Sequence, residues 1–180
     1  MDVAEAIKTR RSIRKYTPEV VSATSLEEIV ELASYAPSWK NSQTPGYVII
    51  QNRDIIEKIA NEGILGFEFN KSTILNCSAL VVITTLGKRC GYEKDGSFTT
   101  KKGDKWEMFD AGIAAQTFML AAHARGIGSV VLGIFDEDYV ADIIKLEEGK
   151  SVSALIAVGY PAEKPVAPKR KAMEELVRFL

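Results

Sequence analysis

The chain contains few of the residues that bind metals or form covalent cross-links. Its 180 residues include one histidine and two cysteines, Cys77 and Cys90. These are too few and too far apart for a cysteine and histidine metal site, which leaves only a carboxylate site open, and nothing in the sequence suggests one. A Ser–His–Asp triad would need His123, which lies in a predicted helix, where a partly buried or capping histidine is the simpler interpretation.

The sequence also lacks a dominant charge and long apolar runs. The net charge is −1, which gives no overall attraction to nucleic acid or to an anionic membrane surface. No apolar run approaches the roughly 20 residues of a membrane-spanning helix, and the first residues lack the apolar core of a secretory signal. Two cysteines in such a chain are typical of a reducing compartment, so we expect a cytoplasmic protein.

Hydrophobic residues make up 46% of the chain, and no linker, repeat or low-complexity segment interrupts it. We therefore expect one domain over residues 1–180. Periodicity and capping patterns predict helices that begin after Asp2, at a Ser25–Glu28 capping box, near Asp54, near 105 and after Asp136. Strands are expected at 47–52, 79–85, 126–135 and 151–159. Residues 63–78 carry no clear pattern.

The order of these elements indicates an α+β fold, a three-layer sandwich around a mixed, mostly antiparallel sheet. A regular doubly wound sheet is disfavoured, since no G-x-G-x-x-G pattern follows a strand. Residues 87–104, rich in Gly, Lys and Asp, predict a long exposed flap near the site. The helix at 105–125 has small residues on several sides, which suits a core helix or a subunit interface equally. The apolar C-terminal segment must dock on its own subunit or on a partner.

Four short segments could carry chemistry, and each also has an ordinary structural interpretation. Arg10-Arg11-Ser12-Ile13-Arg14 suits a phosphate group, because guanidinium groups bind phosphate oxygens in pairs, but a solvated basic face is commoner. The loop from Pro37 to Gln43 offers amide groups for the edge of a heteroaromatic ring, or is a polar turn. Gly133, after Leu132, allows close approach of a ligand to the backbone, or forms a turn. Lys169-Arg170-Lys171 is a second cationic cluster, or a solubilising tail.

Together and in this order, these segments resemble the nitroreductase family of FMN-dependent oxidoreductases. The resemblance runs over essentially the whole chain and rests on RRSIRKY at 10–16, APSWKNSQTP at 36–45, DAGIAAQTFMLAAHARGIGS at 110–129, VLGIF at 131–135, and GYP followed by PKRKAMEELV at 168–177. It implies an intertwined homodimer with the long helix at its centre, the C-terminal segment reaching over the partner, and two FMN molecules at the interface. The commoner loop of the family has a small residue at the position of Trp39, which affects substrate choice more than flavin binding.

The resemblance also assigns cofactor-binding residues. Arg10, Arg11, Ser12 and Arg14 would serve the phosphate, ribityl chain and pyrimidine side of one flavin, and Lys169, Arg170 and Lys171 would add to the phosphate site. Leu132 and Gly133 would place backbone groups near flavin N5, with Asn70 as a further contact. The other subunit would provide Pro37, Ser38, Trp39, Asn41 and Gln43.

The implied activity is a ping-pong reaction in which NADH or NADPH donates hydride to tightly bound, non-covalent FMN. An electron-poor small molecule, such as a nitroaromatic, quinone or enone, then takes the electrons. No side chain acts as a catalytic nucleophile or metal ligand, because the flavin carries the chemistry. Three alternatives stay open: a flavin-binding protein for storage or sensing, specialised flavin chemistry such as dehalogenation, and a nucleic-acid module, which the net charge disfavours.

Overall fold

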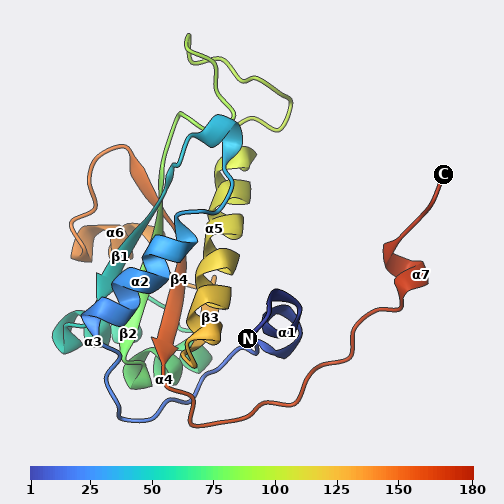
Figure 1. Cartoon of the computed structure of the whole chain (residues 1–180). Helices are drawn as coiled ribbons and strands as arrows, with labels where there is room; N and C mark the ends of the chain where they lie inside the picture. Colours follow the sequence, from blue (N-terminus) through green and yellow to red (C-terminus); the bar gives the residue numbers. More distant parts are fainter.

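A four-stranded antiparallel sheet forms the centre of the molecule. Figure 1 shows the computed structural model, which describes residues 1–180. The strands lie in the order β1-β2-β4-β3, and every neighbouring pair is antiparallel. Their bounds are β1 Pro45–Ile50, β2 Ala79–Leu86, β3 Gly128–Leu132 and β4 Lys150–Gly159. No helix of the structure is both long enough and apolar enough to cross a membrane.

Helices cover both faces of this sheet and make the predicted three layers. On one face lie α2 (Ala23–Ala33) and α5 (Lys105–Ala124). On the other lie α3 (Arg53–Glu62), α4 (Glu68–Asn76) and α6 (Glu137–Ile143). The remaining helices are α1 (Val3–Thr9), the 3-10 turn η1 (Trp39–Asn41) and α7 (Met173–Leu176). The α+β sandwich expected from the sequence is therefore confirmed.

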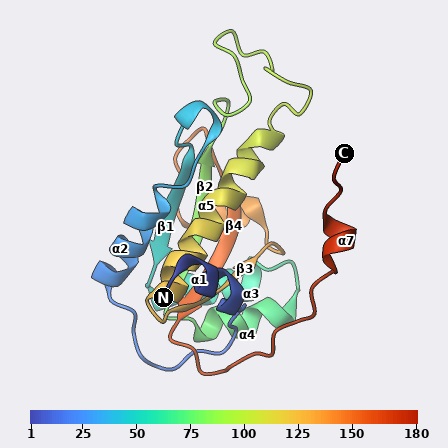
Figure 2. The same ribbon diagram turned by 45° about the vertical axis from the view of Figure 1, so that its right-hand side comes forward.

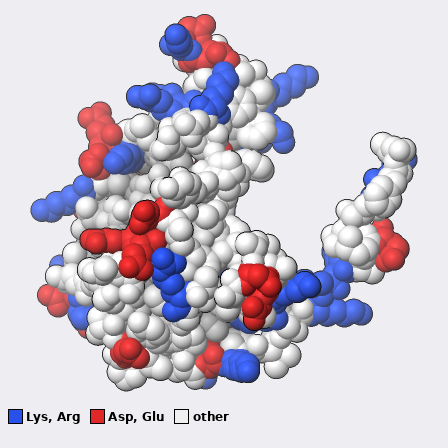
Figure 3. Space-filling model, in the orientation of Figure 1, with Lys and Arg blue, Asp and Glu red and all other residues white.

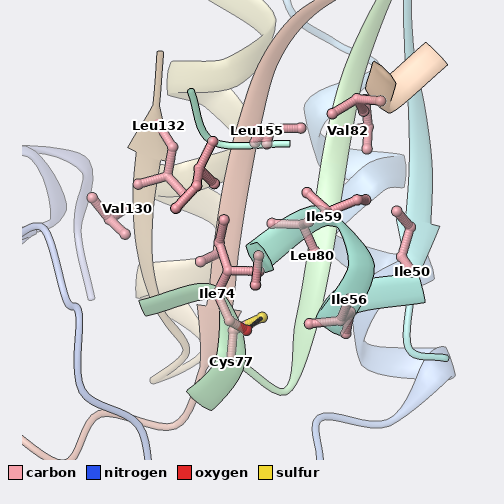
Figure 4. Packing of buried hydrophobic residues seen from close by; sticks show 14 of the residues in the cluster. Ile50, Ile56, Ile59, Ile74, Cys77, Leu80, Val82, Val130, Leu132 and Leu155 are labelled. Atoms are coloured by element: carbon pink, nitrogen blue, oxygen red, sulfur yellow. Dashed lines mark hydrogen bonds between the residues drawn. The ribbon is translucent and has the colours of Figure 1, made fainter. Parts of the chain in front are cut away.

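Two hydrophobic cores follow from the alternation of side chains along the central strands. In β2, Leu80 and Val82 face the core under α3, α4 and α6, which Figure 4 shows, whereas Val81 and Ile83 face the core under α2 and α5. Because both faces are covered, β2 is apolar at nearly every position, as expected of a doubly buried strand. This sheet is the rigid support on which the loops of the site are mounted.

Three local predictions need correction. The second helix is capped by Ser22, whose hydroxyl accepts a hydrogen bond from the Ser25 amide, so the predicted Ser25 cap lies inside the first turn. The unassigned stretch contains α4, whose buried polar residues Asn70 and Thr73 obscure the helical pattern. The strand expected at 126–135 is limited to Gly128–Leu132, because Gly126 turns the chain with a positive φ of 74° after α5.

The two ends of α5 carry different parts of the molecule. The exposed segment 87–104 projects beyond its N-terminal end, and α1 lies beside its C-terminal end, as Figures 1 and 2 show. The tail after Ala162 runs beneath the body in Figure 2 and then rises beside it, and its residues are exposed along most of its length. Its apolar side chains are exposed, and those of Val166, Phe179 and Leu180 are almost fully so.

Candidate functional site

The N-terminal arginine loop is anchored to β3. Ser12 forms a parallel bridge with Ser129, and the Ile13 amide donates to the Ser129 carbonyl oxygen at 3.0 Å. Ile13 is buried against Gly128, where an added Cβ would come within 2.9 Å of its side chain. A buried isoleucine therefore fixes the loop and leaves the neighbouring arginine, Arg14, exposed to solvent.

A group of like charges gathers beside this loop. The pKa of Arg10 is lowered by partial burial and then by repulsion from Arg11 and from Arg170 of the tail. None of Arg10, Arg11, Arg14 or Arg170 takes part in the four ion pairs of the structure. Figure 3 shows Lys and Arg side chains collected where the tail passes the body. Arginines that repel each other without a carboxylate partner make a site for an anion.

A pocket of about 480 Å³ lies next to the arginine loop and brings together four of the sequence-predicted residues. It is lined by Arg14, Leu132 and Gly133, together with Asn70 and the aromatic side chains of Phe67 and Phe69. The side-chain amide of Asn70 donates from Nδ2 to the Ile134 carbonyl oxygen at 3.1 Å, which holds the segment after β3. At Gly133 an added Cβ would meet nothing within 4 Å, so the backbone there faces open space.

The amide-bearing loop lies elsewhere on the chain. The Trp39 amide donates to Asp110 Oδ2 at 2.8 Å, and the Trp39 ring lies 5.0 Å from the ring of Trp106. Both partners belong to the N-terminal half of α5. Within the loop, the Gln43 amide donates to Ser38 Oγ at 2.9 Å.

A single chain does not bring the two halves of the predicted site together. The arginine loop follows α1, which is tied to the C-terminal end of α5 by a hydrogen bond of 2.8 Å between Thr9 Oγ1 and His123 Nε2. Asp110 and His123 are thirteen positions apart, or about 20 Å along the helix axis. The loop at Trp39 and the arginines at 10–14 therefore stand at opposite ends of α5.

The single histidine, His123, contacts α1 and is partly buried. The pKa of His123 is lowered below its ordinary value of 6.5 by partial burial and then by Arg10 and Arg11. It lies beside Thr9 and partly buried, as the sequence predicted, with no Ser–His–Asp arrangement around it.

Several residues of these regions escaped the sequence analysis. Asp110, Cys90 and Trp106 support the loop at Trp39, and Phe67 and Phe69 line the pocket at Gly133. The sequence contains one signal for Asp110, because this charged residue begins an Ala-rich helical segment that is expected to be buried. A buried carboxylate requires hydrogen-bond partners, so such a residue is a candidate for a contact with another segment.

Comparison with known proteins assigns the chain to a family. The model of the nitroreductase family matches residues 7–65 and 67–160. A protein of Methanothermobacter thermautotrophicus, provisionally named NADH dehydrogenase/NAD(P)H nitroreductase, is 33% identical over 92% of this chain and 80% of its own. A nitroreductase family protein of Streptococcus pneumoniae superposes with a TM-score of 0.85 at 20% identity, covering 99% of this chain and 100% of its own. A provisionally named nitroreductase of Exiguobacterium sibiricum, solved in complex with FMN, has a TM-score of 0.83 at 20% identity, covering 100% and 98%. With a family match over most of its length, a fold shared with these structures and its own arginine and glycine landmarks in place, the chain belongs to the nitroreductase family.

Proposed function

We propose that this protein is an FMN-dependent NAD(P)H oxidoreductase of 180 residues in one flavin-binding domain, acting as a homodimer on electron-poor small molecules. The observation that carries the proposal is the pocket in which Arg14, a residue of the arginine loop that forms no ion pair, lies beside the open backbone at Gly133. The FMN in the Exiguobacterium structure and the nicotinamide in the name of the Methanothermobacter relative support it.

The residues present fit FMN by their chemistry. The flavin phosphate is a dianion, and Arg11 and Arg170 lie close enough to Arg10 to lower its pKa, so together they would offer it three guanidinium groups. Ser12 adds a hydroxyl, and Lys169 and Lys171 add charge along the exposed tail. Arg14 borders the neighbouring pocket, where it would neutralise negative charge on the pyrimidine side of a reduced flavin.

Gly133 would provide backbone contacts to the ring system, because an added Cβ there would meet nothing within 4 Å, and Leu132 lines the same pocket. The polar loop residues would come from the second subunit, since they are far from the arginines of their own chain. These residues are Pro37, Ser38, Trp39, Asn41 and Gln43.

A homodimer would cover apolar surface that one chain leaves open. On α5, Met108 and Phe109 are each 57% exposed, and the tail exposes Val166, Phe179 and Leu180. Figure 3 shows mostly uncharged atoms on the side of the body that faces the tail. A second copy placed on α5 would bury these side chains and would bring its own polar loop toward the arginines of the first chain.

When bound, FMN supplies the hydride chemistry, so the protein itself must position the reactants and adjust the charge around them. We infer a ping-pong order in which the nicotinamide and the acceptor, a nitroaromatic, quinone or enone, use the same space in turn. The aromatic rings of Phe67 and Phe69 border that pocket and suit a planar ligand.

The test is a visible spectrum of the purified protein followed by anaerobic titration with NADH and with NADPH. We expect a yellow protein that either nicotinamide bleaches and that a quinone or nitroaromatic restores to yellow. A protein that is colourless after incubation with FMN and removal of the unbound flavin would exclude flavin binding. A yellow protein that neither nicotinamide bleaches would instead indicate storage or sensing.

A further inference from the structure

Asp110 is a carboxylate buried without a cation. Its residue is 3% exposed, and it takes part in none of the four ion pairs of the structure. Instead it accepts a hydrogen bond at Oδ2 from the Trp39 amide at 2.8 Å and another from the Cys90 thiol at 3.0 Å. Burial and the carboxylate of Asp110 raise the pKa of Cys90 to about 12, so the thiol keeps its proton and acts as the donor.

Two segments that are remote in sequence therefore meet at one carboxylate on α5. Trp39 belongs to the polar loop, and Cys90 is a buried residue of the otherwise mostly exposed segment 87–104. The rings add a second contact, since Trp39 lies 5.0 Å from Trp106, which in turn lies 5.4 Å from Phe109. The hydrogen bond from Trp39 joins the backbone of the polar loop to the long helix.

The loop held in this way has an unusual backbone. Lys40, Asn41 and Gln43 have φ values of 46°, 55° and 49°, in the left-handed region that non-glycine residues rarely adopt. Each such residue costs on the order of 1 kcal/mol and persists only where surrounding contacts determine the conformation. Its internal hydrogen bonds, from Asn41 to the Ser38 carbonyl and from Gln43 to Ser38 Oγ, do not attach it to the rest of the molecule.

We propose that Asp110 is a positioning residue that holds the strained loop 38–43 in the conformation that faces the flavin of the partner subunit. The inference rests on the proposed function, because it assigns a purpose to the loop. An apolar residue at this place would avoid the cost of burying a carboxylate but would offer nothing to the Trp39 amide. The carboxylate also ties the segment 87–104 to the same point, so this segment and the loop share one support.

Amide hydrogen exchange and circular dichroism test the fixation of the loop without any flavin. We expect Asp110→Ala to speed exchange of the Trp39 amide at least about tenfold, because its acceptor is gone. In the same variant, the circular dichroism signal that arises from coupling between the close rings of Trp39 and Trp106 should weaken. Asp110→Asn keeps a carbonyl oxygen as acceptor and should remain within roughly threefold of the wild type.

The affinity for FMN tests whether the hold of Asp110 on loop 38–43 serves flavin binding. We expect Asp110→Ala to weaken FMN binding on the order of tenfold, with Asp110→Asn restoring most of it. Asp104→Ala is the matched control, since Asp104 is an exposed carboxylate at the same end of α5 whose side chain makes no capping hydrogen bond. This control should leave both the exchange rate and FMN affinity unchanged.

An Asp110→Ala protein whose Trp39 exchange and FMN affinity both stay within about twofold of the wild type would overturn the inference. Faster exchange with unchanged FMN affinity would overturn it too, because Asp110 would then hold the loop without serving the flavin. If the alanine variant does not fold, amide exchange in the wild-type protein provides the test. A Trp39 amide that exchanges as fast as the exposed loop amides is not held by Asp110, and this result would overturn the inference. Wild type that binds no FMN would remove the proposed function, while the exchange result would still report whether Asp110 fixes the loop.

Discussion

At the scale of single residues, the arginine loop is organised by its one buried member. Ile13 packs against Gly128, and the backbone hydrogen bond to Ser129 fixes the strand-like course of the loop. Glu163 adds support, since its Oε1 accepts from the Arg14 amide at 2.7 Å and from the Lys15 amide at 3.2 Å. The carboxylate thus binds the backbone of the loop and leaves the Arg14 guanidinium at the pocket.

Replacing Arg14 with Ala should weaken FMN binding. A charged hydrogen bond contributes roughly 1.5–3 kcal/mol, so we expect the dissociation constant to rise about tenfold or more. Fluorescence quenching of added FMN measures it. Arg125→Ala is the control, because Arg125 pairs with Glu28 at the surface, away from the pocket. Equal affinity of the Arg14 variant and the wild type would show that Arg14 does not touch the flavin.

His123 should titrate below its ordinary pKa. Burial, Arg10 and Arg11 disfavour the imidazolium in the folded protein. Folding therefore favours the neutral ring, so this contribution to stability is complete above 6.5, the ordinary value, and is lost as the pH falls through the lower pKa of the folded state.

As the only histidine, it gives a single set of ring signals in an NMR titration. The unfolded protein in urea serves as the reference and should titrate near 6.5. A folded pKa at or above that reference would contradict the expected repulsion. Bound FMN phosphate should raise the pKa of His123 by neutralising the nearby arginines.

At the scale of elements, helix capping depends on which hydroxyl reaches the first free amide. Ser22 precedes α2 and Ser25 lies in its first turn, and their hydroxyl groups are 2.9 Å apart. Ser22 has the extended backbone of a capping residue, with ψ of 151°, and its side chain accepts from the Ser25 amide. The helix therefore starts one turn earlier than the predicted capping box.

Ser22→Ala should lower the free energy of unfolding by about 1 kcal/mol, the usual cost of losing a capping oxygen. Ser25→Ala should cost clearly less, because Ser25 contributes its amide to the cap and keeps that amide after substitution. Urea denaturation of the two variants measures the difference. A larger loss from Ser25→Ala would return the cap to the position predicted from the sequence.

At the scale of the whole molecule, dimerisation would explain both the exposed apolar tail and the exposed apolar side chains on α5. The tail begins firmly, since Glu163 holds the Arg14 and Lys15 amides, and then leaves the body with its apolar side chains uncovered. Arg170 stays close enough to Arg10 to lower its pKa. Dimerisation would thus connect burial of the tail with completion of the phosphate site.

Deleting residues 165–180 should weaken the dimer and FMN binding together, because the deletion removes both the apolar tail and Arg170. Sedimentation velocity should find the full chain at twice the mass of one subunit and the shortened chain shifted toward one subunit. Glu163 remains in the shortened chain, so the arginine loop keeps its support. A shortened chain that stays dimeric at the same dilution would show that the exposed face of α5 holds the two subunits together without the tail.

The sequence alone determined the features that depend on near neighbours. Asp2 and Asp136 cap α1 and α6 as predicted, because a capping carboxylate needs only the amide three residues ahead. The strands β2 and β4 follow from their apolar stretches, and the basic and amide-bearing segments can be recognised from local sequence. The α+β class follows from the order of these elements.

Only the tertiary structure decided which of these segments meet. It placed Arg14 with Gly133 and Asn70, and it separated the arginine loop from the loop at Trp39 by much of the length of α5. It also revealed Asp110 as the point where Trp39 and Cys90 converge. Such contacts join residues far apart in the chain, and their geometry depends on how the helices pack on the sheet. No local pattern carries that information, because periodicity and capping report only on residues within a few positions of each other.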